Sequence, residues 1–243
     1  MKNQYLGDIG DFGKYGLLRF LSSKGLVIGV NWYLTPNDGG PDGRYTDYLS
    51  KNENRKYDEE LFDLLQTIAR NPDKNLGMAE VSKMIPNAVL FDRMLKPESV
   101  QKIGDRRKLR REWHAAAMNT LKNAMLIFAD PDNGLSEKSP GSVISSKYAF
   151  PTELADYYRR EQDVVYYCHK GRRTMDAWND ARMEMKKQIS DCSIFTLTFH
   201  RGTQRSYIFV IHPEKREYYT RLIKEFLETP WKELFTEEYL KMY

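Results

Sequence analysis

The stretch "FADPDNGL" (128–135) places acidic and amide side chains directly after an apolar run. Asp130 ends that run, and a carboxylate at the end of a buried strand commonly serves a ligand or a reaction. Asp132 follows two residues later, and two carboxylates at this spacing can bind one hard cation through oxygen ligands. Pro131 and Asn133 also make the same letters a good turn sequence. The stretch alone therefore leaves three interpretations open: a catalytic site, a cation site and a polar turn.

Two basic clusters each contain a histidine and a glycine, "HKGRR" (169–173) and "HRGTQR" (200–205). Arginine offers a two-pronged donor to phosphate oxygens, and glycine-bearing turns expose backbone N–H groups. His169 is the candidate for moving protons, since histidine can both accept and donate a proton near neutral pH. The candidates for binding substrate phosphates are Arg44, Arg173, His200, Arg201 and Arg205. Solvated loops without a ligand are the alternative interpretation of both clusters.

The residues Asp8, Asp11 and Lys14 precede or open an apolar helix predicted over 11–25. Aspartate at a helix start is a common cap and a partner of the helix dipole. A cation in the first helical turn is mildly disfavoured by the same dipole. We therefore expect Lys14 to have a partner, either an aspartate or the carboxylate of a ligand.

The order of predicted elements is that of an α/β protein. Runs rich in β-branched and aromatic residues predict strands over 26–35, 87–92, 124–130 and 163–168. Apolar residues at helical spacing predict helices over 11–25, 58–70, 105–123, 151–160 and 174–189. A hairpin of strands 193–199 and 205–212 follows, and then helical stretches at about 214–228 and 231–241. We predict a Rossmann-like open, mostly parallel sheet with helices on both faces and a C-terminal antiparallel β-hairpin.

Polar candidates follow the predicted strands at the point where each strand ends. In this order along the chain they are Asn37 and Asp38, Asp92, Asp130 and Asp132, His169, and His200 with Arg201. Because ligands of such folds bind beyond the carboxyl ends of the strands, we expect these side chains to line one cleft.

The bulk composition is that of one domain of mixed charge. The chain has 243 residues, 38 basic and 34 acidic side chains, a net charge of +4 and a mean hydropathy of −0.67. This balance permits nucleic-acid binding without demanding it. No apolar run approaches the ~20 residues of a membrane span, and the first residues lack the apolar core of a signal peptide. We expect one cytoplasmic domain over 1–243, with a helical insertion around 50–87, no membrane contact and reduced cysteines.

Four stretches, in order along most of the chain, are similar to motifs of one known family. "GDIGDFGKYGLLRFL" (7–21) is similar to a Gly-Asn-His-Ala-Asp-x-x-Lys start, and "YLTPNDGGPDGRY" (33–45) to a Thr-His-Ala-Gly-Ala-Gly-Arg-Tyr loop. "VLFD" (89–92) is similar to a strand that ends in a carboxylate, and "LIFADPDNGL" (126–135) to an Asp-Pro-Pro-Tyr motif. The chain thereby resembles the bacterial large-subunit ribosomal RNA adenine-N6 methyltransferases, class I enzymes that use S-adenosylmethionine.

The resemblance implies a methyltransferase-like fold, S-adenosylmethionine as the cofactor and an exocyclic amine of a nucleic acid as the methyl acceptor. It implies that Asp130 and Pro131 accept the hydrogens of that amine on a flipped base. Asp132 and Asn133 stand where the family has a second proline and an aromatic ring. Together with His169, these residues are the catalytic candidates.

Two features of the family's site, the stacking ring and the cofactor pocket, would have to be supplied in this chain by residues that differ from the family's motifs. The stacking ring would come from a tyrosine elsewhere, such as Tyr148 or Tyr167. The cofactor pocket would be lined by Lys14, Asn37, Asp38, Gly39, Gly40 and Asp92. Two adjacent glycines there would let the backbone approach a ligand closely.

Two other functions remain open, whereas the leading interpretation requires no metal ion. A metal-dependent nuclease or phosphodiesterase would bind Mg²⁺ through carboxylates and move protons with His169 or His200. Its ligands would be Asp11, Asp38, Asp130 and Asp132. A non-catalytic relative would keep the fold to bind nucleic acid or another protein. The basic helix "KIGDRRKLRREWH" (102–114) could contact a nucleic-acid backbone, or it could be a solvated face.

Overall fold

A mixed seven-stranded sheet forms the centre of the protein, in a computed structural model that describes residues 2, 6–37, 39, 45–70, 83–136 and 139–238. The strand order is β2-β1-β3-β4-β6-β5-β7. The strands are β1 (Ile28–Asn31), β2 (Val89–Phe91), β3 (Leu126–Ala129), β4 (Asp163–Cys168), β5 (Ser193–Phe199), β6 (Arg205–Ile211) and β7 (Phe235–Glu237). The pairs β1/β2, β1/β3 and β3/β4 are parallel, and the others are antiparallel. The predicted α/β fold with a C-terminal hairpin is confirmed.

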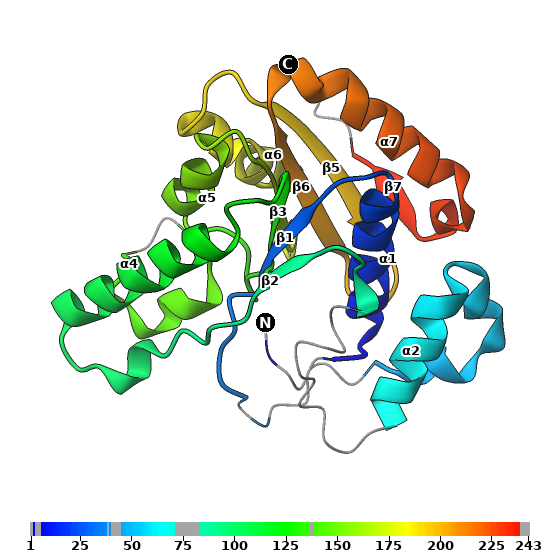
Figure 1. Ribbon diagram of the computed structural model, residues 1–243, viewed down its shortest axis with the longest axis horizontal. Coiled ribbons are helices and arrows are strands. Elements are labelled where there is room, and N and C mark those ends of the chain that lie inside the picture. The colour runs from blue at the N-terminus through cyan, green and yellow to red at the C-terminus, as the bar shows by residue number, and fades with distance from the viewer. Residues whose placement is uncertain are drawn as a thin grey trace.

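Helices cover both faces of the sheet, as Figure 1 shows. One face carries α1 (Ile9–Ser23), α2 (Glu59–Arg70) and α7 (Arg216–Glu228), and the other carries α4 (Ile103–Thr120), α5 (Pro151–Tyr158) and α6 (Met175–Met183). Short 3-10 turns connect these elements: η2 (Asp47–Ser50), η3 (Asn52–Lys56), η4 (Pro97–Ser99), η5 (Val143–Lys147), η6 (Glu184–Lys187), η7 (Pro213–Lys215) and η8 (Pro230–Glu233).

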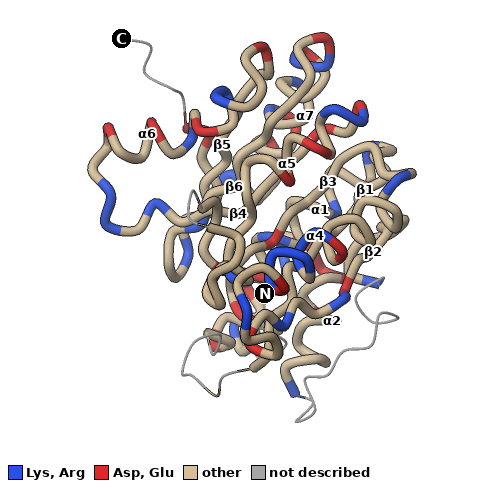
Figure 2. Tube along the Cα trace, turned by 90° about the vertical axis from the view of Figure 1, so that its left-hand side faces the viewer, with Lys and Arg blue, Asp and Glu red and all other residues tan. Residues whose placement is uncertain are grey.

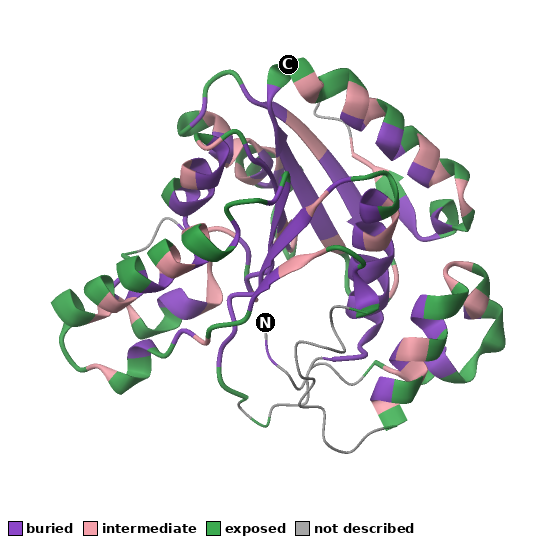
Figure 3. Ribbon diagram, viewed as in Figure 1, coloured by how far each residue is buried: buried purple, intermediate pink, exposed green. Residues whose placement is uncertain are grey.

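The strands alternate between two hydrophobic cores. Phe128 belongs to the core under α1 and α7, whereas its neighbour Ile127 belongs to the core under α4 and α5. This alternation is the two-residue period of a strand that is buried on both faces. Figure 3 accordingly shows the central strands in purple, while the outer surfaces of α4 and α7 carry green exposed residues.

Three glycines one turn apart let α1 lie close to the C-terminal part of the chain: Gly10, Gly13 and Gly16. A Cβ atom at these positions would overlap the side chains of Arg205, Phe199 and Trp231, respectively. The close approach therefore depends on the absence of side chains on this stripe of the helix. It fixes the first turn of α1 beside the start of β6.

The helix predicted over 11–25 begins earlier than expected. Asp8 caps it by accepting the N–H of Gly10 at 2.8 Å, so that the helix starts at Ile9. Lys14 therefore lies in the second turn, and the dipole argument for its partner does not apply. Lys14 is instead only 5% exposed, and a buried ammonium requires a partner for a stronger reason.

The helix predicted over about 231–241 is wrong for residues 231–238, the part of it that the structure describes. Pro230 starts the turn η8, and the chain then extends as β7, which pairs antiparallel with β5. The ring of Phe235 packs against Phe199 and Tyr207, at centroid distances of 5.1 and 6.0 Å. This aromatic packing and the hydrogen bonds of the sheet edge outweigh the helical spacing of the letters.

Two further predicted segments differ in extent from what the structure describes. The helix predicted over 174–189 is α6, which ends at Met183 and continues as the 3-10 turn η6. Of the insertion predicted around 50–87, the structure describes η3 and α2, while 71–82 lies outside the described residues. Within the described ranges, no helix combines the length and the apolar character needed to cross a bilayer.

Candidate functional site

The carboxyl ends of β1 and β3 meet α1 at the point where the strand order reverses. The two ends are tied together, since the backbone N–H of Asp130 donates to the carbonyl of Asn31 at 2.9 Å. Open α/β sheets bind ligands at such a switch point. A pocket of about 390 Å³ lies beside this point, between the first turns of α1, the ends of β3 and β4 and the start of β6. It is lined by Lys2, Asp8, Gly10, Asp11, Lys14, Tyr45, Asp130, Pro131, Asp132, Asn133, Lys147, Tyr167, His169, Thr203, Arg205 and Tyr207.

A buried ammonium joins α1 to the end of β3 in the wall of this pocket. Nζ of Lys14 lies 2.7 Å from Oδ1 of Asp11 and 2.8 Å from Oδ2 of Asp130. Burial alone would lower the pKa of Lys14, but the two carboxylates raise it well above its usual value. Lys14 therefore stays charged, and of the two kinds of partner expected for it, an aspartate or the carboxylate of a ligand, the structure shows aspartates.

A second ion pair borders the pocket. Nη2 of Arg205 donates to Oδ1 of Asp8 at 2.8 Å. Asp8 also accepts the backbone N–H groups of Gly10 and Tyr45. Arg205 donates to the carbonyl of Thr203 at 3.1 Å as well, so both its charge and its position are fixed within the protein. This arginine is a positioned wall of the pocket rather than a mobile surface cation.

A tyrosine–histidine pair at the end of β4 lines the same pocket. The hydroxyl of Tyr167 lies 2.5 Å from Nε2 of His169, and Nδ1 of that ring lies 3.1 Å from the carbonyl oxygen of Gln204. A carbonyl only accepts, so Nδ1 carries the hydrogen and Nε2 accepts from the Tyr167 hydroxyl. Burial lowers the pKa of His169 below its usual value. The ring is therefore neutral at pH 7 and can take up a proton.

Tyr207 lines the pocket from β6, paired in register with Tyr167 of β4. Its side chain is fully buried, and its hydroxyl has no hydrogen-bond partner in the described part of the chain. Burial raises the pKa of this hydroxyl, which stays protonated. A buried polar group without a partner costs about 1–3 kcal/mol. A ligand that bonds to the Tyr207 hydroxyl would recover part of that free energy.

The segment after β3 is also a well-built turn. The N–H of Asn133 donates to the carbonyl of Lys147 at 2.9 Å. Gly134 has a φ of 82°, and a Cβ there would stand 2.7 Å from Sγ of Cys168. Only glycine fits both the conformation and the contact. The turn interpretation is therefore confirmed, and the turn holds Asp132 and Asn133 in the pocket wall.

The pocket brings together many of the residues predicted from widely separated stretches. These are Lys14, Asp130, Pro131, Asp132, Asn133, His169 and Arg205, with Asp11 from the metal-dependent alternative. Tyr167, one of the two tyrosines suggested for the stacking ring, lies there, whereas Tyr148 does not line the pocket. The predicted cleft thus receives side chains from α1, β3, β4 and β6.

Other predicted residues lie outside the described lining: Asn37, Gly39, Asp92, Arg173, His200 and Arg201. Arg173 donates to the carbonyl of His169 at 2.6 Å, and so supports that loop. Arg201 donates to Asn54 at 2.5 Å, and His200 contacts the hydroxyl of Thr236 at 2.6 Å. Asp38, Gly40 and Arg44 lie outside the described residues.

Sequence reasoning missed Tyr207, Lys147 and Tyr45. The hairpin pairing carries the signal for Tyr207, because β6 is the strand that places it opposite Tyr167. That pairing was open in the sequence, where the hairpin could lie beside β4 through either of its strands. Among the described residues, no group of three or more His, Cys, Asp or Glu side chains is arranged to hold a metal ion.

Comparisons with known proteins give similarities to solved structures. No family model matches the chain, and no curated protein matches it. The structure is similar to the crystal structure of protein LPL1258 from Legionella pneumophila str. Philadelphia 1, which is described with the family model DUF519. The two sequences are 13% identical, the similarity covers 96% of each chain, and the TM-score is 0.47.

Proposed function

We propose that this protein transfers a methyl group from S-adenosylmethionine to an exocyclic amine of a nucleic acid. The observation that carries the proposal is the position of Asp130 and Pro131. They end β3 at the switch point of the sheet and line a polar pocket together with Lys14 of α1. The resemblance of their stretch to an Asp-Pro-Pro-Tyr motif supports the same chemistry.

The side chains of the pocket suit S-adenosylmethionine, which carries an ammonium, a carboxylate, ribose hydroxyls and an adenine ring. Asp8 and Asp11 are acceptors for ammonium and hydroxyl groups, and Lys14 is a donor for a carboxylate. The unpartnered hydroxyl of Tyr207 is available to a ligand. The pocket volume of about 390 Å³ lies within the range usual for small-ligand sites.

The cofactor would supply an electrophilic methyl group, and the protein would hold the amine that receives it. The carboxylate of Asp130 and the carbonyl of Pro131 are both acceptors for amine hydrogens. The Lys14 ammonium donates to Oδ2 of Asp130 at 2.8 Å and so fixes the position of that carboxylate. Tyr167, which is only partly buried, presents a ring at the same pocket, where a base could stack although the motif has no aromatic residue.

The methylated amine must lose one hydrogen as a proton, and the pocket holds two acceptors for it. One is the carboxylate of Asp130. The other is Nε2 of His169, which the Tyr167 hydroxyl contacts at 2.5 Å. In this second route Tyr167 gives its proton to His169 while it takes the proton of the amine, so that the tyrosine ends as it began.

The position of Lys14 favours this function over a metal-dependent nuclease. Its ammonium lies within 2.8 Å of both Asp11 and Asp130, which are two of the carboxylates that the nuclease would need as ligands. A divalent cation bound by the same oxygens would stand beside a fixed positive charge. Coulomb repulsion at such distances is severe in a buried site.

The test is transfer of a tritiated methyl group from S-adenosylmethionine to RNA and DNA pools. We expect incorporation by the natural protein and its loss in Asp130→Ala. Asp63→Ala is the matched control, because Asp63 is an exposed carboxylate paired with Arg55 on the surface. Full incorporation by Asp130→Ala would exclude the role given to this carboxylate. No incorporation by the natural protein into either pool would leave the proposal without a substrate.

A further inference from the structure

A second pocket lies on the other face of the sheet, between α4 and the start of α5. Its volume is about 560 Å³. Helix α4 contributes Arg107, Arg110, Arg111 and His114, and acidic lining residues are Glu153, Asp156 and Glu184. Some of these charges are paired within the protein, and others are not.

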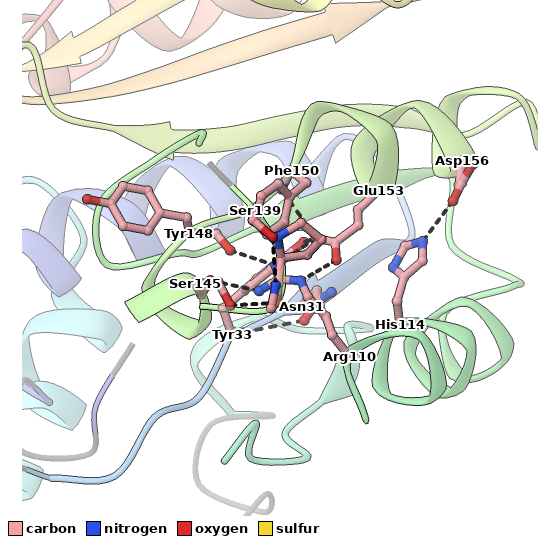
Figure 4. A network of polar contacts seen from close by, with 12 residues as sticks. Asn31, Tyr33, Arg110, His114, Ser139, Ser145, Tyr148, Phe150, Glu153 and Asp156 are labelled. Carbon is pink, nitrogen blue, oxygen red and sulfur yellow. Dashed lines mark hydrogen bonds and ion pairs between the residues drawn. The ribbon is translucent and has the colours of Figure 1, made fainter. Parts of the chain in front are cut away.

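Arg110 is paired within the protein. Figure 4 shows its guanidinium between Glu153 and the segment that precedes α5. It donates to Glu153 at 2.6 and 2.9 Å, and to the carbonyls of Ser145 and Tyr148 at 2.7 Å each. Its group also lies over the ring of Phe150, 4.3 Å from the centroid. Arg110 thus forms a rigid, neutralised floor of the pocket.

The remaining acids of the pocket are paired as well. Asp156 accepts from His114 at 3.1 Å, and Glu184 accepts from Lys187 at 2.6 Å. Arg107 and Arg111 differ, because neither has a carboxylate partner in the part of the chain that the structure describes. Arg107 contacts only the hydroxyl of Ser139, at 3.1 Å. Two exposed guanidinium groups are therefore left on the rim of the pocket.

These two arginines lie on one side of α4. They are four residues apart, so their side chains are neighbours on the helix surface. Lys102 and Lys108 are exposed on the same helix, whose basic positions are drawn in blue in Figure 2. Arginine with unpaired N–H groups is the side chain best suited to phosphate oxygens. The rim is therefore a positively charged surface built on a fixed floor.

One segment forms walls of both pockets. Asn133 and Lys147 line the first pocket, while Ser136, Pro140 and Phe150 line the second. A single strand of nucleic acid that lies on α4 would therefore be only one loop away from Asp130. Its backbone could be held on one side of this loop and a flipped base on the other.

We propose that Arg107 and Arg111 bind the backbone phosphates of the single-stranded nucleic acid whose base enters the first pocket. This inference rests on the proposed function for the identity of the first pocket's ligand. The phosphate contacts themselves require only the second pocket and its rim.

The experiment is fluorescence anisotropy with a labelled single strand of RNA, its DNA equivalent and the duplex, in the absence of S-adenosylmethionine. For Arg107→Gln/Arg111→Gln we expect affinity for the single strand to fall about tenfold or more. The slope of log affinity against log salt should become shallower by about 1.4, at ~0.7 per lost phosphate contact. Arg221→Gln/Lys224→Gln removes two exposed cations of α7 and serves as the control, with affinity unchanged.

The other outcomes separate the two proposals. Single-strand affinity equal in the double variant and the natural protein would overturn this inference, as would the absence of binding to all three probes. Displacement of the probe by inorganic phosphate beyond that caused by chloride of equal ionic strength would mean a site for free phosphate instead. If the natural protein transfers no methyl group but binds the single-stranded nucleic acid through these arginines, only the proposed function would be overturned. S-adenosylmethionine binding should be the same in the double variant and the natural protein.

Discussion

The buried ion pairs around Lys14 and around Arg110 lie on opposite faces of the sheet and differ in their surroundings. Arg110 is enclosed by Glu153 and by two backbone carbonyls, and each of these contacts is a short hydrogen bond. Lys14 is equally buried between Asp11 and Asp130; these three residues line the polar pocket at the end of β3, whereas Arg110 and Glu153 line the pocket beside α4. The hydroxyl of Tyr207, which has no partner among the described residues, lines that pocket too.

We propose that the charge of Arg110 holds the fold, whereas the charge of Lys14 serves a ligand. The Arg110 group has its acceptors within the protein and connects α4 to α5 and to the segment before it. The Lys14 group stands at the switch point of the sheet, where ligands of such folds bind. We therefore expect changes at Arg110 to act mainly on stability, and changes around Lys14 to act mainly on ligand binding.

The largest effect is expected from Arg110→Met. The change leaves Glu153 buried without its cation, and breaking a buried ion pair in this way costs about 3–5 kcal/mol. The free energy of unfolding in urea measures this loss. Arg111→Met is the control, because Arg111 is the next residue of α4 and is exposed. Its free energy of unfolding should stay within about 0.5 kcal/mol of that of the natural protein. A loss below about 1 kcal/mol for Arg110→Met would remove the structural half of the comparison.

Lys14→Met should destabilise less, by about 1–3 kcal/mol, because water in the pocket can solvate the two carboxylates. Burial already raises the pKa of Asp11 although the ammonium beside it lowers that pKa, and removing the ammonium should raise it further. A carboxyl group with a raised folded-state pKa stabilises the fold only when protonated, so the variant should regain stability as the pH falls from 7 towards 4. Urea unfolding across this range measures the recovery. A constant difference from the natural protein would mean that the carboxylates are not coupled to Lys14.

Tyr207→Phe sharpens the comparison by removing only the unpartnered hydroxyl. We expect unchanged or slightly higher stability, because no hydrogen bond within the described structure is lost. Affinity for S-adenosylmethionine should fall by about 2- to 10-fold, the usual worth of one hydrogen bond. Thermal unfolding and a ligand titration on the same variant measure the two quantities. Lower stability with unchanged affinity would assign the hydroxyl to the fold.

The smallest expected effect concerns His169. Burial lowers its pKa, so the folded protein binds fewer protons there than the unfolded chain. Stability should therefore fall as the pH drops below about 6.5, the ordinary histidine pKa. His169→Gln should lack this contribution. The difference in the free energy of unfolding between the natural protein and His169→Gln should shrink from pH 7 to pH 5 in urea. A difference that grows would show that the pKa of His169 is raised instead.

The helices and strands could be predicted from the sequence better than the contacts and pairings between them. β4, from Asp163 to Cys168, was predicted with its exact bounds, because its run of β-branched and aromatic residues is a local signal. The partner of Lys14 was predicted in kind, but Asp130 lies 116 positions away, and no local period links them. β7 was predicted as helix because its pairing with β5 and the packing of Phe235 arise only in the folded sheet.

Calorimetric titration with S-adenosylmethionine, with and without magnesium, tests the central claim most directly. We predict saturable binding in the micromolar range that does not depend on magnesium, that Lys14→Met abolishes and that Arg221→Gln/Lys224→Gln leaves intact. This result would establish the pocket at the ends of β3 and β4 as the cofactor site. Heat from magnesium alone, with none from S-adenosylmethionine, would contradict the account and make the aspartates around Lys14 an ion site.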